Sequence, residues 1–337
     1  MQQSHAPRPL PLFLELVRMA SDREPELAVK ALEGLAKYEN APRLKDRKPK
    51  PIAAQQEGAV LRDHGGTGAP IILIPSLINP PTILDLDDEV SLAGALAEAG
   101  RRVLLLDWGK ADHRRELSIT GHVEAILVPL IASLGQPASL LGYCLGGTMA
   151  IAAANLLPVE RVITLAAPWH FSGYPDEARN SLQRLWAASA RAAQQLGALP
   201  MEVLQSAFWS LDPERTVAKF SSFAELDEDS DDERRFVTLE DWANEGEPLP
   251  FPAARELLED LFGSDLPGKG EWSVGGRPVT DRLDCPALHI TAASDRITPA
   301  AAAPHGDCIQ IPSGHVGMIV GSARAKLHEE MARFLAD

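Results

Sequence analysis

Cysteine is scarce in this sequence, which has only Cys144, Cys285 and Cys308 among its 337 residues. Their number is odd and no two of them form a Cys-x-x-Cys pair, so the chain has neither a disulfide framework nor a cysteine-based metal motif. We therefore expect a reducing, cytoplasmic environment. Because no other metal-ligand spacing and no dinucleotide-binding loop is visible, we also expect no bound metal and no resident cofactor.

Positive charge and long apolar runs are lacking as well. The chain has 32 Lys and Arg against 47 Asp and Glu, which gives a formal net charge of −15 at pH 7. Such an acidic protein is a poor partner for nucleic acid or an anionic membrane. No run of about 18 apolar residues occurs, and residues 1–8 do not begin a secretory signal. We expect no membrane span and a cytoplasmic protein.

Hydrophobic residues make up 45% of the chain, which is typical of a globular protein. From about residue 58, apolar strand-like runs alternate with helix-like segments. This order predicts an α/β fold with a mainly parallel sheet between layers of helices. The predicted strands are 59–62, 71–75, 102–107, 138–143, 161–166, 287–291 and 308–311, and the predicted helices are 92–99, 123–134, 145–157 and 323–335.

We predict three parts in the chain. Residues 1–54 form an N-terminal helical segment and a linker, residues 55–168 and 263–337 form the α/β core, and residues 169–262 form an inserted helical cap. The insertion is rich in Trp and Phe, and a cap at this position would cover an active site; extra packing helices are the alternative. The linker is interpreted as a solvated tether because of its basic residues, Arg43, Lys45, Arg47, Lys48 and Lys50.

The segment Gly142-Tyr143-Cys144-Leu145-Gly146 has the Gly-x-nucleophile-x-Gly spacing of a nucleophile elbow, with cysteine in place of serine. In such a sharp turn between strand and helix, glycines at Gly142 and Gly146 avoid a clash that a Cβ would cause. The start of the following helix favours a thiolate at Cys144. The alternative is a buried structural cysteine beside glycines that allow a helix to pack closely.

Two further residues follow in the order expected for an α/β-hydrolase. Asp295 comes after the predicted strand 287–291, and His315 comes after the last predicted strand. We predict Cys144 as nucleophile, His315 as its base and Asp295 as the acid that orients the base. The backbone N–H groups of Leu145 and Leu77 are predicted to form the oxyanion hole.

Other candidates are given simpler roles. His170 follows a strand and could line the pocket, but nothing pairs it with Cys144. Structural roles are predicted for His289 within an apolar strand, for His122 as a cap at a helix start, and for Cys285 and Cys308 as packing residues. Asp107 is interpreted as a structural or pocket residue. His305 precedes the final strand and is expected to face the wrong end of the sheet.

These motifs resemble the polyhydroxyalkanoate synthase family. Residues 142–147 match its Gly-x-Cys-x-Gly-Gly box, and the similarity extends over residues 55–337, most of all to the short class III catalytic subunit. The family has the α/β-hydrolase fold. The resemblance implies that Cys144 carries the growing acyl chain as a thioester, that His315 activates Cys144, and that Asp295 helps to activate the incoming hydroxyl. The chain departs from the family at Arg296, where histidine is usual, and at His170, where aspartate is common.

The function implied by the resemblance is polymerisation of (R)-3-hydroxyacyl-CoA into polyester. The CoA thioester is then a substrate, the polyester chain is a second partner, and either a partner subunit or a homodimer is expected at cytoplasmic polyester granules. Two alternatives stay open. The same three residues could serve a hydrolase, namely a thioesterase, an esterase or an intracellular polyhydroxyalkanoate depolymerase. The chain could also be a granule-associated scaffold without catalysis.

Overall fold

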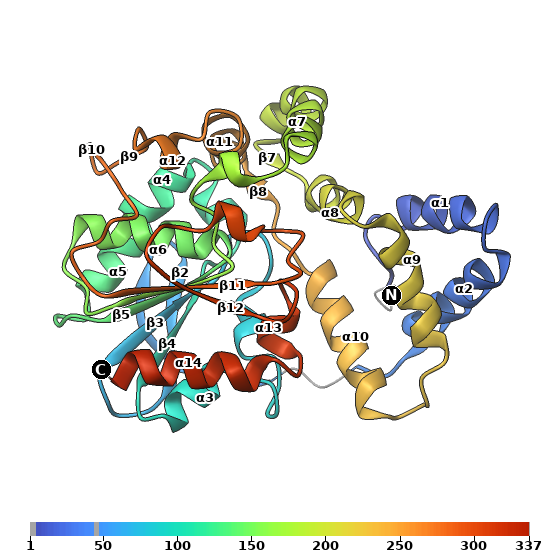
Figure 1. Ribbon diagram of the computed structural model, residues 1–337, viewed down its shortest axis with the longest axis horizontal. Helices are drawn as coiled ribbons and strands as arrows, with labels where there is room; N and C mark the ends of the chain where they lie inside the picture. The colour runs from blue at the N-terminus through green and yellow to red at the C-terminus, as the bar shows by residue number, and fades with distance from the viewer. Residues whose placement is uncertain (1–4, 44–46, 337) are drawn as a thin grey trace. The chain divides into compact units, whose positions relative to one another are not determined.

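The apolar runs of the sequence assemble into one eight-stranded sheet (Figure 1). The computed structural model describes residues 5–43 and 47–336. The strand order is β1-β2-β4-β3-β5-β6-β11-β12, with parallel neighbours from β4 to β12 and antiparallel pairing of β1 with β2 and of β2 with β4. The strands are β1 (Ile52–Gln56), β2 (Ala59–Gly65), β3 (Pro70–Ile74), β4 (Arg102–Asp107), β5 (Ser139–Tyr143), β6 (Val162–Leu165), β11 (Ala287–Ala292) and β12 (Asp307–Ile311).

Helices cover both faces of this sheet, which explains why every residue of β3 and β5 is buried. In Figure 1, α3 and α14 lie on one side of the sheet and α4, α5 and α6 on the other. The predicted α/β fold is thereby confirmed. The helices of this part are α3 (Leu92–Glu98), α4 (Ile119–His122), α5 (Val128–Ala132), α6 (Leu145–Leu156), α7 (Asp176–Leu196), α11 (Phe251–Arg255), α12 (Leu266–Lys269), α13 (Gly317–Val320) and α14 (Arg324–Ala336).

Short elements complete the connections. Two minor two-stranded sheets pair β7 with β8 and β9 with β10. The short strands are β7 (Ala198–Leu199), β8 (Leu249–Pro250), β9 (Ser273–Val274) and β10 (Arg277–Pro278), the 3₁₀ turns are η1 (Pro81–Leu84), η2 (Ala111–Arg114), η4 (Phe171–Gly173) and η6 (Ala300–Ala302), and the π-helical turns are η3 (Val123–Leu127) and η5 (Glu256–Leu261).

Two local predictions need correction. The helix predicted over 123–134 begins earlier, at Ile119, and passes through the π-helical turn η3 just before Pro129. Proline has no N–H to donate and crowds the carbonyl four residues back, so the helix widens there. Strand β1 was not predicted because its residues, Ile-Ala-Ala-Gln-Gln, are mostly exposed and show no apolar alternation.

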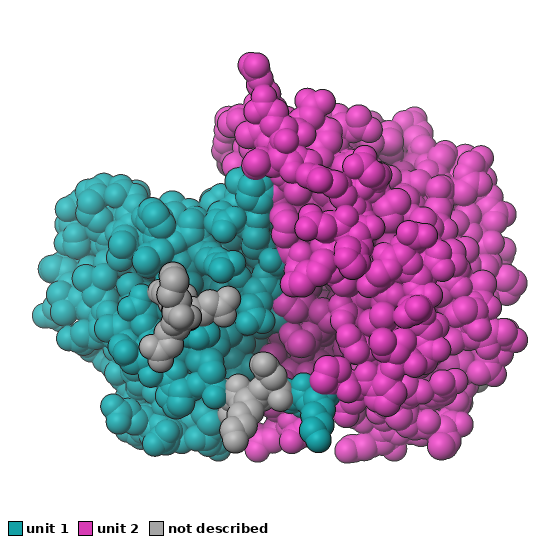
Figure 2. Space-filling view, turned by 180° about the vertical axis from the view of Figure 1, so that it is seen from behind, with its two compact units in different colours: residues 1–48, 200–246 teal, residues 49–199, 247–337 magenta. Residues whose placement is uncertain are grey.

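The chain folds as two compact units, coloured separately in Figure 2. Unit 1 contains Met1–Lys48 and Pro200–Gly246, and unit 2 contains Pro49–Leu199 and Glu247–Asp337. These boundaries differ from the predicted ones, because the middle of the predicted cap joins the N-terminal helices while its two ends belong to the unit with the sheet. Strand β1 likewise belongs to unit 2, although residues 52–54 were assigned to the linker.

Unit 1 consists of helices around an aromatic core. Its helices are α1 (Leu10–Ser21), α2 (Pro25–Asn40), α8 (Met201–Ser210), α9 (Pro213–Ala224) and α10 (Asp231–Asn244). Phe13, Tyr38 and Phe220 are fully buried at its centre. Helices α2 and α9 approach closely at Gly34, where an added Cβ would lie 1.9 Å from the carbonyl oxygen of Phe220. Shared burial of these apolar faces is why residues 200–246 pack with helices α1 and α2.

The basic stretch is not simply a solvated tether. Arg43 Nε lies 2.9 Å from Asp241 Oδ2, and the same carboxylate accepts a 2.6 Å hydrogen bond from the Tyr38 hydroxyl. Arg43 therefore stabilises unit 1, and the tether prediction is wrong for this residue. Lys45 lies outside the described residues. Among the residues that the structure covers, no helix is long and apolar enough to cross a membrane.

Candidate active site

Cys144 lies between β5 and α6 in a strained conformation. Its φ is +55° and its ψ is −130°, a region that costs a non-glycine residue about 1–3 kcal/mol. Two backbone hydrogen bonds fix the turn: Cys144 N–H donates to the Leu165 carbonyl at 2.9 Å, and Gly147 N–H donates to the Cys144 carbonyl at 2.8 Å. The turn places the thiol at the N-terminus of α6, where the helix dipole favours negative charge.

Gly142 and Gly146 are needed for close packing around this turn. A Cβ on Gly142 would lie 2.3 Å from Gly147 Cα, and a Cβ on Gly146 would lie 2.1 Å from the Ile74 carbonyl oxygen. Both contacts are with backbone, which cannot move aside as a flexible side chain could. The glycines therefore allow α6 to begin directly against the end of β3.

His315 and Asp295 meet on the loops after β12 and β11. The Nδ1–H of His315 donates to Asp295 Oδ2 at 2.7 Å. The other carboxylate oxygen, Oδ1, accepts from the N–H groups of Ile297 and Thr298, both at 2.8 Å. The Asp295 side chain is fully buried. With three donors, this carboxylate is held in one orientation and fixes the tautomer of His315.

The third predicted residue, Cys144, lies close enough to His315 to influence the charge of its imidazole. Since Nδ1 is occupied by Asp295, Nε2 is the nitrogen left for the thiol. Burial alone would lower the pKa of His315, but the charges of Cys144 and Asp295 and their hydrogen bonds raise it to about 10. An imidazolium is thus favoured beside the sulfur. The structure brings the three predicted residues together.

Two buried tyrosines border this group. The Tyr143 hydroxyl donates to the His315 carbonyl at 3.3 Å, and the two rings lie 5.1 Å apart. Tyr174 contacts Thr298 through its hydroxyl at 3.5 Å. Burial, reinforced by the charges of Cys144 and Asp295, raises the pKa of both tyrosines above the ordinary value, so both stay neutral.

The backbone N–H groups proposed for an oxyanion hole are free to donate. Within the part of the chain that the structure describes, neither Leu145 N–H nor Leu77 N–H donates a hydrogen bond to the protein. The loop that carries Leu77 is held from behind, because Trp108 Nε1 donates to the Pro75 carbonyl at 3.1 Å and Arg114 Nη2 approaches the Leu77 carbonyl at 3.5 Å.

Arg114 is a residue of this region that the sequence patterns missed, and His122 was given a different role. Arg114 is 2% exposed, and its Nη1 donates to His122 Nε2 at 3.2 Å. Burial lowers the pKa of His122 to about 4, so its neutral ring donates from Nδ1 to the Ser118 carbonyl at 2.6 Å. The capping role predicted for His122 is wrong, because the Ser118 hydroxyl caps α4. A single arginine at the end of a short 3₁₀ turn carries no sequence signal for burial.

The remaining candidates are His289, Asp107, Cys308 and Cys285. His289 is buried in β11 and bonds to Thr164 Oγ1 at 2.8 Å, which confirms its structural role. Asp107 forms an ion pair with Arg62 at 3.2 Å. Cys308 is exposed, so the prediction that it is a packing residue is wrong. Cys285 is only half-buried.

The comparisons with known proteins agree with this fold. The Alpha/beta hydrolase family model matches residues 71–329. A poly(3-hydroxyalkanoate) polymerase subunit of Haloarcula marismortui is 29% identical over 84% of this chain and 64% of its own length. One from Allochromatium vinosum is 25% identical over 79% of this chain and 80% of its own length. A carboxylesterase structure from Nitrososphaera gargenis, 16% identical, covers 85% of this chain and 98% of that chain with a TM-score of 0.52.

The chain spans slightly less than two thirds of the Haloarcula relative, at 64%. The carboxylesterase likeness shows the fold alone. The resemblance to polyhydroxyalkanoate synthases that the motifs indicated is confirmed by the curated relatives. With the match over residues 71–329 and the parallel sheet, this chain belongs to the alpha/beta hydrolase family.

Proposed function

We propose that this chain is an acyltransferase that polymerises (R)-3-hydroxyacyl-CoA into polyhydroxyalkanoate through a thioester on Cys144. The observation that carries the proposal is the contact of a strained cysteine with a histidine that a buried aspartate orients. The similarity to poly(3-hydroxyalkanoate) polymerase subunits supports the substrate class. No resident cofactor enters the proposed reaction.

In the first half-reaction, Cys144 Sγ attacks the carbonyl carbon of the CoA thioester. The negative charge that develops on the carbonyl oxygen is stabilised by the N–H groups of Leu145 and Leu77. The carbon–sulfur bond to CoA then breaks, and the CoA thiolate takes the proton held by His315. Asp295 keeps the imidazole oriented throughout.

In the second half-reaction, a hydroxyl of another hydroxyacyl unit attacks the thioester on Cys144. His315 accepts the hydroxyl proton, an ester bond forms, and the Cys144 thiolate is released. A cysteine suits this sequence because exchange between two thioesters is nearly energy-neutral, so the acyl group can remain on the enzyme until the next unit arrives. The growing polyester is then a bound partner, and a second subunit or a second copy of the chain is part of the proposal.

The experiment is incubation with (R)-3-hydroxybutyryl-CoA labelled in the acyl group. CoA release, covalent label and the fate of the acyl group are followed together. We expect CoA release, label on Cys144 and oligomeric or insoluble polyester. Release of CoA with only free hydroxy acid would make the chain a thioesterase.

Matched variants assign the roles. Cys144→Ala is expected to abolish covalent labelling while the fold is retained, and undiminished labelling in this variant would contradict the assignment. Asp295→Asn keeps the shape of the side chain but removes its charge, and we expect labelling to slow by roughly 10³–10⁴-fold. Absence of CoA release and of label in the unaltered chain, with the fold intact, would favour the scaffold alternative.

A further inference from the structure

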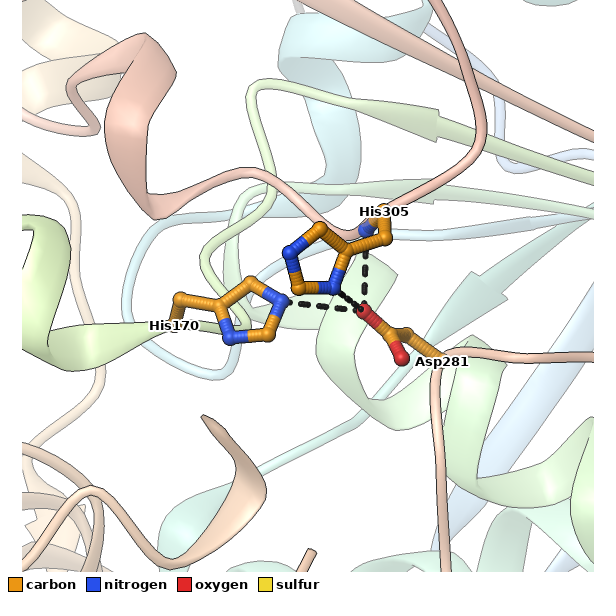
Figure 3. A group of neighbouring side chains, drawn as sticks. All are labelled: His170, Asp281 and His305. Atoms are coloured by element: carbon orange, nitrogen blue, oxygen red, sulfur yellow. Dashed lines mark hydrogen bonds and ion pairs between the residues drawn. The ribbon is translucent and has the colours of Figure 1, made fainter. Parts of the chain in front are cut away.

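Outside the Cys144 site, three side chains from distant segments form a cluster, in which two histidines contact one carboxylate oxygen of an aspartate (Figure 3). His170 Nε2 lies 3.0 Å and His305 Nδ1 lies 3.1 Å from Asp281 Oδ2. His170 follows β6, Asp281 precedes β11, and His305 precedes β12. The two imidazole rings lie against each other with centroids 4.0 Å apart. Both histidines thus direct a nitrogen to the same point.

The backbone holds these three segments in place. The N–H groups of Trp169 and His170 both donate to the Ala302 carbonyl, at 2.7 and 3.0 Å. The turns η4 and η6 pack so closely that a Cβ on Gly173 would lie 2.2 Å from the Ala301 carbonyl oxygen. His305 N–H also donates to Asp281 Oδ2 at 2.8 Å. The arrangement is therefore preformed rather than dependent on long flexible side chains.

We propose that His170, Asp281 and His305 form a binding site for a divalent transition-metal ion, with Zn²⁺ as the best fit. Imidazole nitrogen and carboxylate oxygen are the donors that zinc takes in sites with three protein ligands and one open position. Bonds of about 2.0–2.1 Å in a tetrahedron separate the ligand atoms by about 3.3 Å. The three donor atoms here all lie within 4.8 Å of one another, and two of the separations are 3.0 and 3.1 Å.

The surroundings leave room for entry of the ion and for a water ligand. Asp281 is buried, whereas the side chain of His305 is 72% exposed. His170 and His305 also line a surface pocket together with Cys308. The backbone N–H of His305 would continue to bind the carboxylate, as expected for a ligand that is oriented from outside the coordination sphere.

A metal at this site would brace two loops that also reach the Cys144 site. The loop of His170 continues to Tyr174, whose hydroxyl contacts Thr298 at 3.5 Å. Thr298 N–H in turn donates to Asp295 Oδ1 at 2.8 Å, and the same segment continues to His305. None of the three proposed metal ligands takes part in the proposed acyl transfer. Metal binding can therefore be measured directly, without an assay of enzyme activity.

The test uses the full chain without a polyhistidine tag, stripped of metal with a chelator. Titration with Co²⁺ alone is followed by visible absorption, and Zn²⁺ binding is followed by calorimetry. We expect saturation at one ion per chain, displacement of Co²⁺ by Zn²⁺, and a melting temperature that rises with Zn²⁺ concentration. Failure to saturate at one ion per chain would overturn the proposal.

His305→Ala removes an exposed ligand together with its contacts to His170 and Asp281, so the melting temperature of this variant without metal serves as its own reference. We expect this variant to bind either ion at least about tenfold more weakly and to lose the shift with Zn²⁺. His113→Ala, at another exposed histidine, is the matched control and should bind normally. Cys144→Ala should also bind normally, which separates this site from the proposed function. Equal binding by His305→Ala, or weakening by His113→Ala, would overturn the site.

Discussion

At the scale of single residues, the charge on His315 depends on its neighbours. Burial would lower its pKa below 6.5, yet Cys144 and Asp295 raise it to about 10. A raised pKa means that the folded state binds the proton more tightly than the unfolded chain does. The stabilisation from this proton is therefore fully present below about pH 6.5 and is lost as the pH rises through about 10.

Removal of the thiol should make this dependence visible. In Cys144→Ala, we expect the pKa of His315 to fall, because the interaction with Cys144 that raises it is lost while burial remains. The loss of stability with rising pH should still begin near pH 6.5, which the unfolded chain sets, but it should end at a lower pH and be smaller in total. NMR titration of the His315 ring nitrogens measures the change. His289, which contacts Thr164 rather than Cys144, is the internal control. An unchanged titration of His315 would contradict the coupling.

At the scale of elements, the junction of β5 with α6 combines strain and close packing. Cys144 has an unfavourable backbone conformation, and the helix begins where Gly146 touches the Ile74 carbonyl. Strain of this kind persists only where the surrounding structure over-determines it. The parallel strands β3, β5 and β6 supply that rigidity, because each is buried along its whole length.

Addition of one methyl group at this junction should be costly. In Gly146→Ala, the new Cβ would lie 2.1 Å from the Ile74 oxygen, so we expect a loss of about 1–3 kcal/mol or more in unfolding free energy. Gly121→Ala is the matched control, since its Cβ would meet only side-chain atoms at ordinary contact distance, from Leu117 at 3.4 Å and Ser118 Oγ at 3.6 Å. That change should be neutral or stabilising by up to about 1 kcal/mol. Hydrogen exchange of the β5 and α6 amides measures the change in unfolding free energy in both variants. Equal changes in the two variants would contradict the proposed clash at Gly146.

At the scale of the whole molecule, each of the two compact units buries apolar side chains of its own. The core of unit 1 is formed by helices from two separate stretches of the chain, the N-terminal helices and residues 200–246. Phe220 lies at its centre, and its ring centroid is 4.7 Å from that of Phe13 and 5.4 Å from that of Phe236. Unit 2 has its own core around the sheet. We therefore expect the two units to respond separately to changes in their buried side chains.

This separation predicts local effects of core truncation. Phe220→Ala should destabilise unit 1 by roughly 3–5 kcal/mol, because it empties a fully buried site. Exchange protection in α2 and α9 should fall while protection in β5 and β6 is retained. Phe171→Ala, at an equally buried site in unit 2, should give the reverse pattern. Equal loss of protection in both units after either substitution would contradict independent cores.

Much of the sheet and the candidate active site could be predicted from local signals. Apolar runs marked the strands, and the glycines around Cys144 marked a turn whose sterics depend on nearby residues alone. Asp295 and His315 were found because parallel strands bring their carboxyl ends to one edge of a sheet. The mostly exposed strand β1 gave no such signal, and it was missed.

The sequence by itself thus determined the parallel sheet, the turn at Cys144 and the order of the residues around it. Only the tertiary structure decided that residues 200–246 join the N-terminal helices, that Arg114 is buried on His122, and that Asp281 gathers His170 and His305. Strand periodicity and turn chemistry act between residues close along the chain. The burial of Arg114 and the contact between His170 and Asp281, which are 111 positions apart, depend on how distant segments pack together. Local sequence patterns give no information on such packing.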